Sequence, residues 1–197
     1  MTRIIAGDLG GRRIVVPPAG TRPTSERVRE ALFSALESDP GLSGISVLDL
    51  CAGSGALGLE ALSRGARDAL FVESDRRAAR TLRANLTELG LARRAEVRVA
   101  PVASVLARPA SRRFHLALAD PPYQVPDGEV AQWLAEAERN GWLASDATVV
   151  VERAARRDGV ARFEWPAPLR AVRERRYGDT VLYIGALRLG VRYGAGS

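Results

Sequence analysis

Two short stretches of the sequence hold residue types that could perform chemistry together. Gly53 to Gly58 have the spacing G-x-G-x-x-G, and glycines without a Cβ let a nucleotide-like ligand approach the backbone of a turn. The loop Asp120-Pro121-Pro122-Tyr123 can hold an exocyclic amino group. Asp120 and the Pro121 carbonyl can each accept an amine hydrogen, while Tyr123 stacks on the base. Two acceptors would turn the nitrogen toward tetrahedral geometry and free its lone pair to attack an electrophile.

Two further acids indicate which cofactor the glycine motif would bind. Glu73 ends an apolar stretch, where a carboxylate can accept hydrogen bonds from both hydroxyls of a ribose. Asp49 lies just before the glycines, where it would repel a pyrophosphate but would suit a cofactor with sulfonium and ammonium groups. These acids favour S-adenosylmethionine over NAD. An NAD-dependent reductase would share the glycines and Glu73, but it would not need the loop at Asp120.

The elements that must position these residues alternate between strand and helix from residue 45 onward. We predict strands over 45–50, 69–73, 95–99, 115–119, 148–152, 169–177 and 180–187. We predict helices over 56–64, 76–89, 102–107 and 129–140. This pattern indicates an α/β fold. Because parallel strands end at one edge of the sheet, the glycines, Glu73 and Asp120 should meet there.

The first 38 residues form a separate pattern, which predicts a small extension (1–38) before a catalytic domain (39–197). Residues 3–16 suggest a hairpin, which is too small to be stable alone and must pack on the main body or a partner. A helix should follow from Glu26 to Glu37, capped by Thr24 or Ser25. The arginines around its start either lie on a solvated surface or contact a cofactor carboxylate or phosphate; they are Arg22, Arg27 and Arg29.

Charge is unevenly distributed along the 197 residues. The net charge is +6, and all 29 basic residues are arginine. Residues 1–38 hold 6 arginines against 4 acids and residues 150–197 hold 10 against 5, whereas the middle is nearly balanced. Both ends could line an acidic substrate, although solubility alone would also account for the excess.

Composition excludes several other classes of protein. The chain has a single cysteine and a single histidine, so it cannot form an internal disulfide and we do not expect a zinc site. We find no apolar run of membrane-spanning length and no signal-peptide core, so we expect a cytoplasmic protein that binds no membrane.

At these motifs the chain resembles the bacterial 16S rRNA guanine-N2 methyltransferases of the RsmD family. The resemblance covers nearly the whole chain; its segments are residues 3–7 with Gly11-Arg12, Arg22-Pro23-Thr24 with Arg27–Glu30, Asp49–Gly65 and Asp120–Tyr123. It implies a Rossmann-like class I S-adenosylmethionine-dependent methyltransferase fold, with a seven-stranded, mostly parallel sheet and an N-terminal hairpin-and-helix extension that helps bind RNA. It also implies methylation of one guanine N2 amine of 16S rRNA, within the small ribosomal subunit or a late assembly intermediate.

Two positions depart from the family pattern. Cys51 occupies a place where an aromatic residue is common. Ala100-Pro101-Val102 replaces the acidic or amide residue that often lies near the adenine, so we expect backbone or apolar contacts there.

These considerations assign the site residues. The predicted catalytic residues are Asp120, Pro121, Pro122 and Tyr123. The predicted cofactor-binding residues are Asp49, Ala52, Gly53, Ser54, Gly55, Glu73, Asp120 and Thr24. The predicted RNA-binding residues are Arg3, Arg12, Arg13, Arg22 and Arg27. We expect a monomer without a metal. The alternatives are a methyltransferase of this fold acting on DNA adenine, cytosine or a protein glutamine, and a non-catalytic RNA-binding assembly factor.

Overall fold

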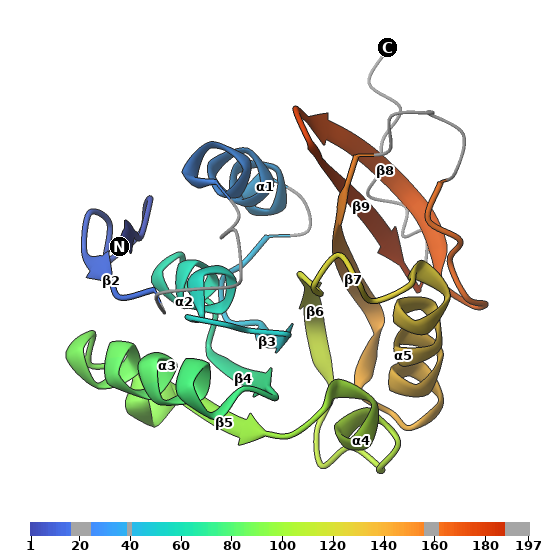
Figure 1. Ribbon diagram of the computed structural model, residues 1–197, viewed down its shortest axis with the longest axis horizontal. Helices are drawn as coiled ribbons and strands as arrows, with labels where there is room; N and C mark the ends of the chain where they lie inside the picture. Colours follow the sequence, from blue (N-terminus) through green and yellow to red (C-terminus); the bar gives the residue numbers. More distant parts are fainter. Residues whose placement is uncertain (17–24, 39–40, 156–161, 188–197) are drawn as a thin grey trace.

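The computed structural model describes residues 1–16, 25–38, 41–155 and 162–187. Within them, seven strands form one twisted sheet in the order β5-β4-β3-β6-β7-β9-β8 (Figure 1). Its strands are β3 (Ser46–Leu50), β4 (Asp68–Glu73), β5 (Ala95–Val99), β6 (Phe114–Ala119), β7 (Leu143–Ala154), β8 (Arg170–Tyr177) and β9 (Thr180–Ala186). Only β9 runs against its neighbours. The predicted seven-stranded, mostly parallel sheet is confirmed.

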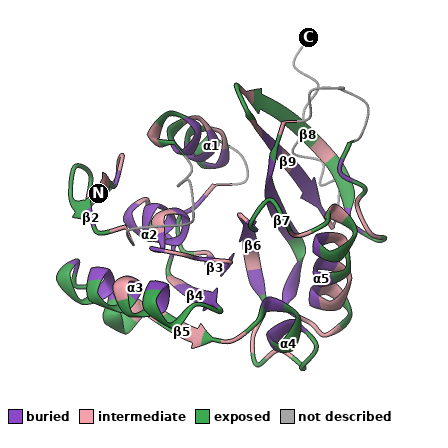
Figure 2. Cartoon of the chain, viewed as in Figure 1, coloured by how far each residue is buried: buried purple, intermediate pink, exposed green. Residues whose placement is uncertain are grey.

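Helices cover both faces of the sheet. The helices are α1 (Glu26–Ser38), α2 (Ala56–Ser63), α3 (Arg76–Glu88), α4 (Val102–Leu106) and α5 (Asp127–Arg139), with a short 3₁₀ turn η1 (Ala92–Arg94). Leucines and a phenylalanine of α1, α2 and α3 form one core layer, and α4 and α5 contribute to the other. The central strands are consequently buried between the layers, whereas β8 at the edge is exposed (Figure 2). None of the described helices combines the length and apolarity that crossing a membrane requires.

Most element boundaries lie within one residue of the predictions, and two elements of the sheet domain begin two or more residues earlier than predicted. Strand β7 begins at Leu143, five residues before the predicted start, and Leu143 pairs with Phe114 ahead of a register irregularity. Exposed Ser145 and Asp146 interrupt the apolar run there, so the sequence pattern resembled a loop. Helix α5 begins at Asp127, directly after Pro126, rather than at Glu129.

The N-terminal hairpin is shorter than predicted, since only β1 (Thr2–Arg3) and β2 (Arg13–Ile14) pair. The N–H of Ile4 still donates across the hairpin to the Arg12 carbonyl, but the next two N–H groups donate to a side chain of the main body instead. Those of Ile5 and Ala6 donate to the Glu60 carboxylate at 2.8 and 3.1 Å. The extension thus packs on α2, as expected for a hairpin that is unstable alone.

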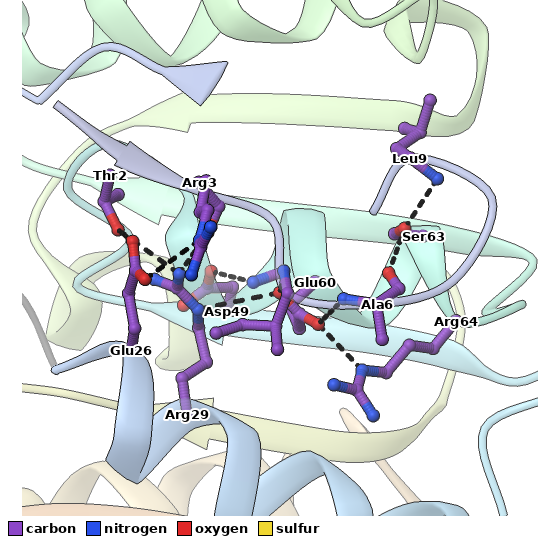
Figure 3. A network of polar contacts seen from close by, with 12 residues as sticks. Thr2, Arg3, Ala6, Leu9, Glu26, Arg29, Asp49, Glu60, Ser63 and Arg64 are labelled. Atoms are coloured by element: carbon purple, nitrogen blue, oxygen red, sulfur yellow. Dashed lines mark hydrogen bonds and ion pairs between the residues drawn. The ribbon is translucent and has the colours of Figure 1, made fainter. Parts of the chain in front are cut away.

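Arg29 is buried, so both predictions for it are wrong: it neither lies on the solvated surface nor is free to contact a cofactor carboxylate or phosphate. Its side chain is completely covered and lies 3.6 Å (Nε to Oε2) from Glu60, which is also covered (Figure 3). It also donates to the carbonyl of Arg3. Through these two contacts Arg29 ties α1 and the hairpin to α2. Removing either partner of the buried ion pair would leave the other charge without compensation.

Candidate active site

The glycine-rich turn joins β3 to α2 through three residues with left-handed backbone. Cys51, Gly53 and Gly55 have φ values of 60°, 56° and 85°. A Cβ on Gly53 would meet nothing within 4 Å, whereas one on Gly58 would lie 2.3 Å from Cε1 of the buried Phe71. Gly58 therefore allows α2 to pack closely on β4. Gly53 leaves open space where a ligand can approach the backbone.

Glu73 holds this turn from the end of the neighbouring strand. Its Oε2 accepts the Gly53 N–H at 2.7 Å, and its Oε1 accepts the Asp75 N–H at 2.7 Å. Each carboxylate oxygen has a further lone pair, so the group can still accept hydrogen bonds from ribose hydroxyls. The same side chain can thus shape the turn and bind a ligand above it.

Asp49 lies at the base of the turn and is 1% exposed. Its Oδ2 accepts the Gly58 N–H at 2.9 Å, in the first turn of α2. Burial raises the pKa of Asp49 to about 8; the Gly58 hydrogen bond opposes this rise, whereas the charges of Asp120 and Glu73 add to it.

A cavity of about 250 Å³ opens at the carboxyl edge of the sheet, where these groups meet. Its described lining includes four acids and no basic residue; the acids are Asp49, Glu73, Asp75 and Asp120. Such a lining suits a ligand with positive charges and would repel phosphates. S-Adenosylmethionine has a sulfonium and an ammonium group, so the acids and the open space at Gly53 fit it.

Most of the predicted cofactor residues line this cavity. Ala52, Gly53 and Ser54 do so, and so does Val102, from the segment after the third strand where apolar contact with adenine is predicted. A Cβ on Gly55 would lie 2.3 Å from Cδ1 of the buried Leu82, and Gly55 is absent from the described lining. Thr24 and Arg22 lie outside the described residues.

The loop after β6 presents an acid to the cavity and an aromatic ring to the surface. Asp120 and Pro122 line the cavity, whereas Pro121 is buried. The Pro122 carbonyl accepts the Val125 N–H at 3.0 Å and so closes a turn around Tyr123. Tyr123 is 48% exposed, which leaves its ring available for stacking.

Asn85 of α3 contributes to the site, although the sequence pattern did not identify it. Its amide donates to the carbonyls of Val15 (2.9 Å) and Ser54 (3.1 Å), and its oxygen accepts the Val15 N–H at 2.9 Å. It therefore connects the N-terminal extension to the glycine turn, and the adjacent Val16 lines the cavity. The available signal was a buried polar residue within the apolar stripe of a helix.

Cys51 lies beside the cavity but is unsuited to nucleophilic chemistry. Burial raises the pKa of its thiol to about 12, and the charges of Glu73, Asp49 and Asp120 contribute to this rise. The thiolate is the reactive form, so Cys51 is inert at neutral pH. Among the described residues, no three His, Cys, Asp or Glu side chains are grouped as metal ligands would be.

The predicted RNA-binding arginines lie on the N-terminal extension. Arg3 pairs with Glu26 (Nε to Oε2, 3.1 Å), and Arg12 donates to the Glu88 carbonyl at 3.0 Å. Both side chains are about half exposed or more, and Arg13 and Arg27 are exposed as well. These positions are compatible with phosphate contact, which stays a prediction.

The fold and the site together define a class I S-adenosylmethionine-dependent methyltransferase. The family described as conserved hypothetical protein 95 matches residues 2–186, and the chain belongs to this family, the RsmD family. The Escherichia coli protein named ribosomal RNA small subunit methyltransferase D is 42% identical over 151 residues, which are 76% of this chain and 73% of the relative. The Haemophilus influenzae protein of the same name is 39% identical over 154 residues, 76% and 77% of the two chains.

A solved structure agrees with the fold over almost the whole chain. An Escherichia coli protein described as a methyltransferase superposes with a TM-score of 0.79 at 34% identity, covering 93% of this chain and 96% of that one.

Cofactor binding should release a proton from Asp49. With a pKa of about 8, roughly nine-tenths of the Asp49 carboxyls are protonated at pH 7. A sulfonium and an ammonium group placed nearby would favour the ionised form. Calorimetry at pH 7 in two buffers of different ionisation enthalpy should therefore show nearly one proton released for each cofactor bound.

Asp49→Asn is the matched control, because it keeps an oxygen for the Gly58 N–H but cannot titrate. Equal proton release by the wild type and by Asp49→Asn would show that Asp49 is already ionised before the cofactor binds.

The same pKa predicts that the protein without cofactor loses stability as the pH rises. The folded-state pKa of Asp49 lies above the unfolded value of about 3.9. The contribution of this carboxyl to the free energy of unfolding is therefore complete below roughly pH 4 and is lost as the pH rises through about 8.

Proposed function

We propose that this protein transfers a methyl group from S-adenosylmethionine to the exocyclic N2 amine of one guanine in 16S rRNA. The observation that carries the proposal is the opening of the Asp120–Tyr123 loop onto the cavity lined by Asp49, Gly53 and Glu73. The RNA substrate is supported by the relatives named ribosomal RNA small subunit methyltransferase D. We further propose that the substrate is the small subunit or a late assembly intermediate, and that the protein acts as a monomer.

The residues of the cavity have separate roles in this reaction. When bound, the cofactor supplies an electrophilic methyl group on sulfur. Glu73 and the backbone around Gly53 hold its ribose, and Asp49 stabilises its positive charge. Asp120 accepts a hydrogen bond from the target amine and then takes a proton once the nitrogen is methylated. Alignment of the amine with the methyl group can contribute roughly 7–11 kcal/mol to lowering the barrier.

The target base must leave its stack or pair to reach this loop. Tyr123 is exposed at the surface beside Pro122, which lines the cavity, so its ring can stack on an extruded base. Stacking of this kind contributes roughly 1–3 kcal/mol per base and tolerates any base. The amine acceptors at Asp120 and Pro121 would then select an amino group at the edge of the base.

The proposal is tested by transfer of labelled methyl groups to small subunits that lack the modification, followed by identification of the methylated nucleoside. N2-Methylguanosine in 16S rRNA is the expected product. N6-Methyladenine, a methylated cytosine or methylated protein glutamine would assign the same site to another acceptor. Parallel reactions with free 16S rRNA, an assembly intermediate and the mature subunit identify the form on which the enzyme acts. Absence of transfer to all three, and also to DNA and protein in parallel reactions, would favour a non-catalytic RNA-binding factor.

Neutralising Arg3, Arg12 and Arg13 should weaken RNA binding without changing cofactor affinity. Loss of three phosphate contacts should reduce the slope of log K against log salt by about 2 for single-stranded RNA. Binding assays across a salt series measure this slope. The matched control replaces Arg93, Arg108 and Arg113, which are exposed and lie toward the amino ends of the parallel strands. Equal slopes for the two triple variants would place the hairpin arginines on a surface that RNA does not contact.

A further inference from the structure

Arg153 is a buried arginine that lies directly behind the acceptor loop. It belongs to β7, two residues beyond Val151, which pairs with Ala119 at the end of β6. Arg153 is only 8% exposed despite its charge. The residue therefore lies at the carboxyl edge of the sheet, next to the strand whose end carries Asp120.

The guanidinium of Arg153 binds the segment that follows Tyr123. Its Nε donates to Oδ1 of Asp127 at 2.6 Å, and its Nη2 donates to the carbonyl of Val125 at 2.6 Å. Two donors of one planar group thus hold two neighbouring points of the chain, a geometry that fixes orientation as well as distance. Asp127 is also the first residue of α5.

These contacts continue into the loop itself. Val125 donates its N–H to the Pro122 carbonyl, so the residue that Arg153 holds by its carbonyl also closes the turn around Tyr123. Pro122, Tyr123 and Gln124 are exposed and have little packing of their own. The position of the turn consequently depends on its two ends, which are β6 at Asp120 and Arg153 at Val125.

Burying a guanidinium is costly unless it is fully paired, and Nη1 of Arg153 has no hydrogen-bond partner within the described residues. An apolar side chain would suit a purely structural role at least as well. Arg153 also acts electrostatically on Cys51, which lines the cofactor cavity, so it lies close to both halves of the site.

We propose that Arg153 is a positioning residue, which fixes the Asp120–Tyr123 loop relative to the cofactor cavity through Val125 and Asp127. It does not contact the reacting atoms. The effect expected on the methylation rate rests on the proposed function, whereas the effect on loop mobility does not.

The test compares Arg153→Met and Arg153→Lys with Arg139→Gln, which removes an exposed ion pair from α5. Hydrogen exchange of the Val125 amide, which donates to Pro122 in the turn, should become at least tenfold faster in Arg153→Met, while exchange in the core strands β3 and β4 stays unchanged. Lysine keeps the charge but offers a single nitrogen in place of the planar guanidinium, so exchange in Arg153→Lys should lie between the wild type and Arg153→Met. Affinity for S-adenosylmethionine, measured by calorimetry, should change less than twofold.

Single-turnover methylation at saturating cofactor should fall at least tenfold in Arg153→Met and be partly recovered in Arg153→Lys. If Arg153→Met does not fold, Arg153→Lys alone provides both measurements. Unchanged exchange in the loop, or exchange that rises equally throughout the protein, would overturn the positioning role. If the wild type does not methylate any small-subunit substrate, the proposed function fails, and the exchange experiment still decides the role of Arg153.

Discussion

Replacing Asp120 with alanine should lower the single-turnover rate of methylation by roughly 10²–10⁴-fold, the usual contribution of a positioned acid or base. Asp120 lines the cavity at the end of β6, where it can accept a hydrogen bond from the target amine. This interaction strengthens as positive charge develops on nitrogen, so its loss affects the transition state more than the bound substrate. RNA affinity should therefore change little. Rapid-quench methylation with enzyme in excess, together with RNA binding assays, measures the two effects separately.

Tyr123 provides the comparison, because its role is to bind rather than to accept protons. Tyr123→Ala should weaken capture of the extruded base by roughly 1–3 kcal/mol, whereas Tyr123→Phe should be mild because the ring face does the stacking. The ring is half exposed, so neither change leaves a cavity in the core. Near-normal single-turnover methylation by Asp120→Ala, or equal damage from phenylalanine and alanine at position 123, would mean that the loop holds the base in another way.

Replacing Glu73 with alanine should weaken S-adenosylmethionine binding by roughly 1–3 kcal/mol, or about 5–150-fold in dissociation constant. The carboxylate is expected to hold the ribose hydroxyls, and it also anchors Gly53 and Asp75 through their N–H groups. Removing it would leave both N–H groups without their acceptor and loosen the turn over which the cofactor binds. Titration calorimetry gives the affinity directly.

Glu73→Gln and Glu96→Ala are the matched controls for this experiment. Glutamine keeps one oxygen that can accept a backbone N–H, but its amide NH₂ group would face the second backbone N–H. The cofactor affinity of Glu73→Gln should therefore lie between those of the wild type and Glu73→Ala. Glu96 pairs with Arg98 on the edge strand β5 and is half exposed, so its loss should leave cofactor affinity unchanged. Binding of NAD in place of S-adenosylmethionine by the wild type would refute the cofactor assignment itself.

The parts of the site that were predictable from sequence follow from local patterns. The glycine turn and Asp120 each follow an apolar strand, Glu73 is the last residue of another, and parallel strands bring their carboxyl ends to one edge. Strand-to-helix alternation is therefore sufficient to place these groups together. The four-residue loop at Asp120 also lies where it was predicted, because β6 ends where its apolar run ends.

The parts that were missed depend on contacts between distant residues. Asn85 binds Ser54 and Val15, which are 31 and 70 positions away, and nothing in its own helix identifies these partners. Arg29 resembled a surface residue because its partner, Glu60, belongs to another helix. The hairpin strands were predicted too long for the same reason, since the N–H groups of Ile5 and Ala6 bind Glu60 rather than the opposite strand. Periodicity cannot indicate a side-chain acceptor that is remote in sequence.

The Glu60 network also determines when the N-terminal extension can become ordered during synthesis. The N–H of Ile5 and the guanidinium of Arg29 both rely on a carboxylate that is translated later, 55 positions after Ile5. At roughly 5–20 residues per second, this interval lasts about 3–11 s. Until α2 has been made, the hairpin lacks the acceptor on which its backbone depends. The N-terminal extension, which is made before α2, must therefore wait for the glycine turn and its helix before it can complete the site.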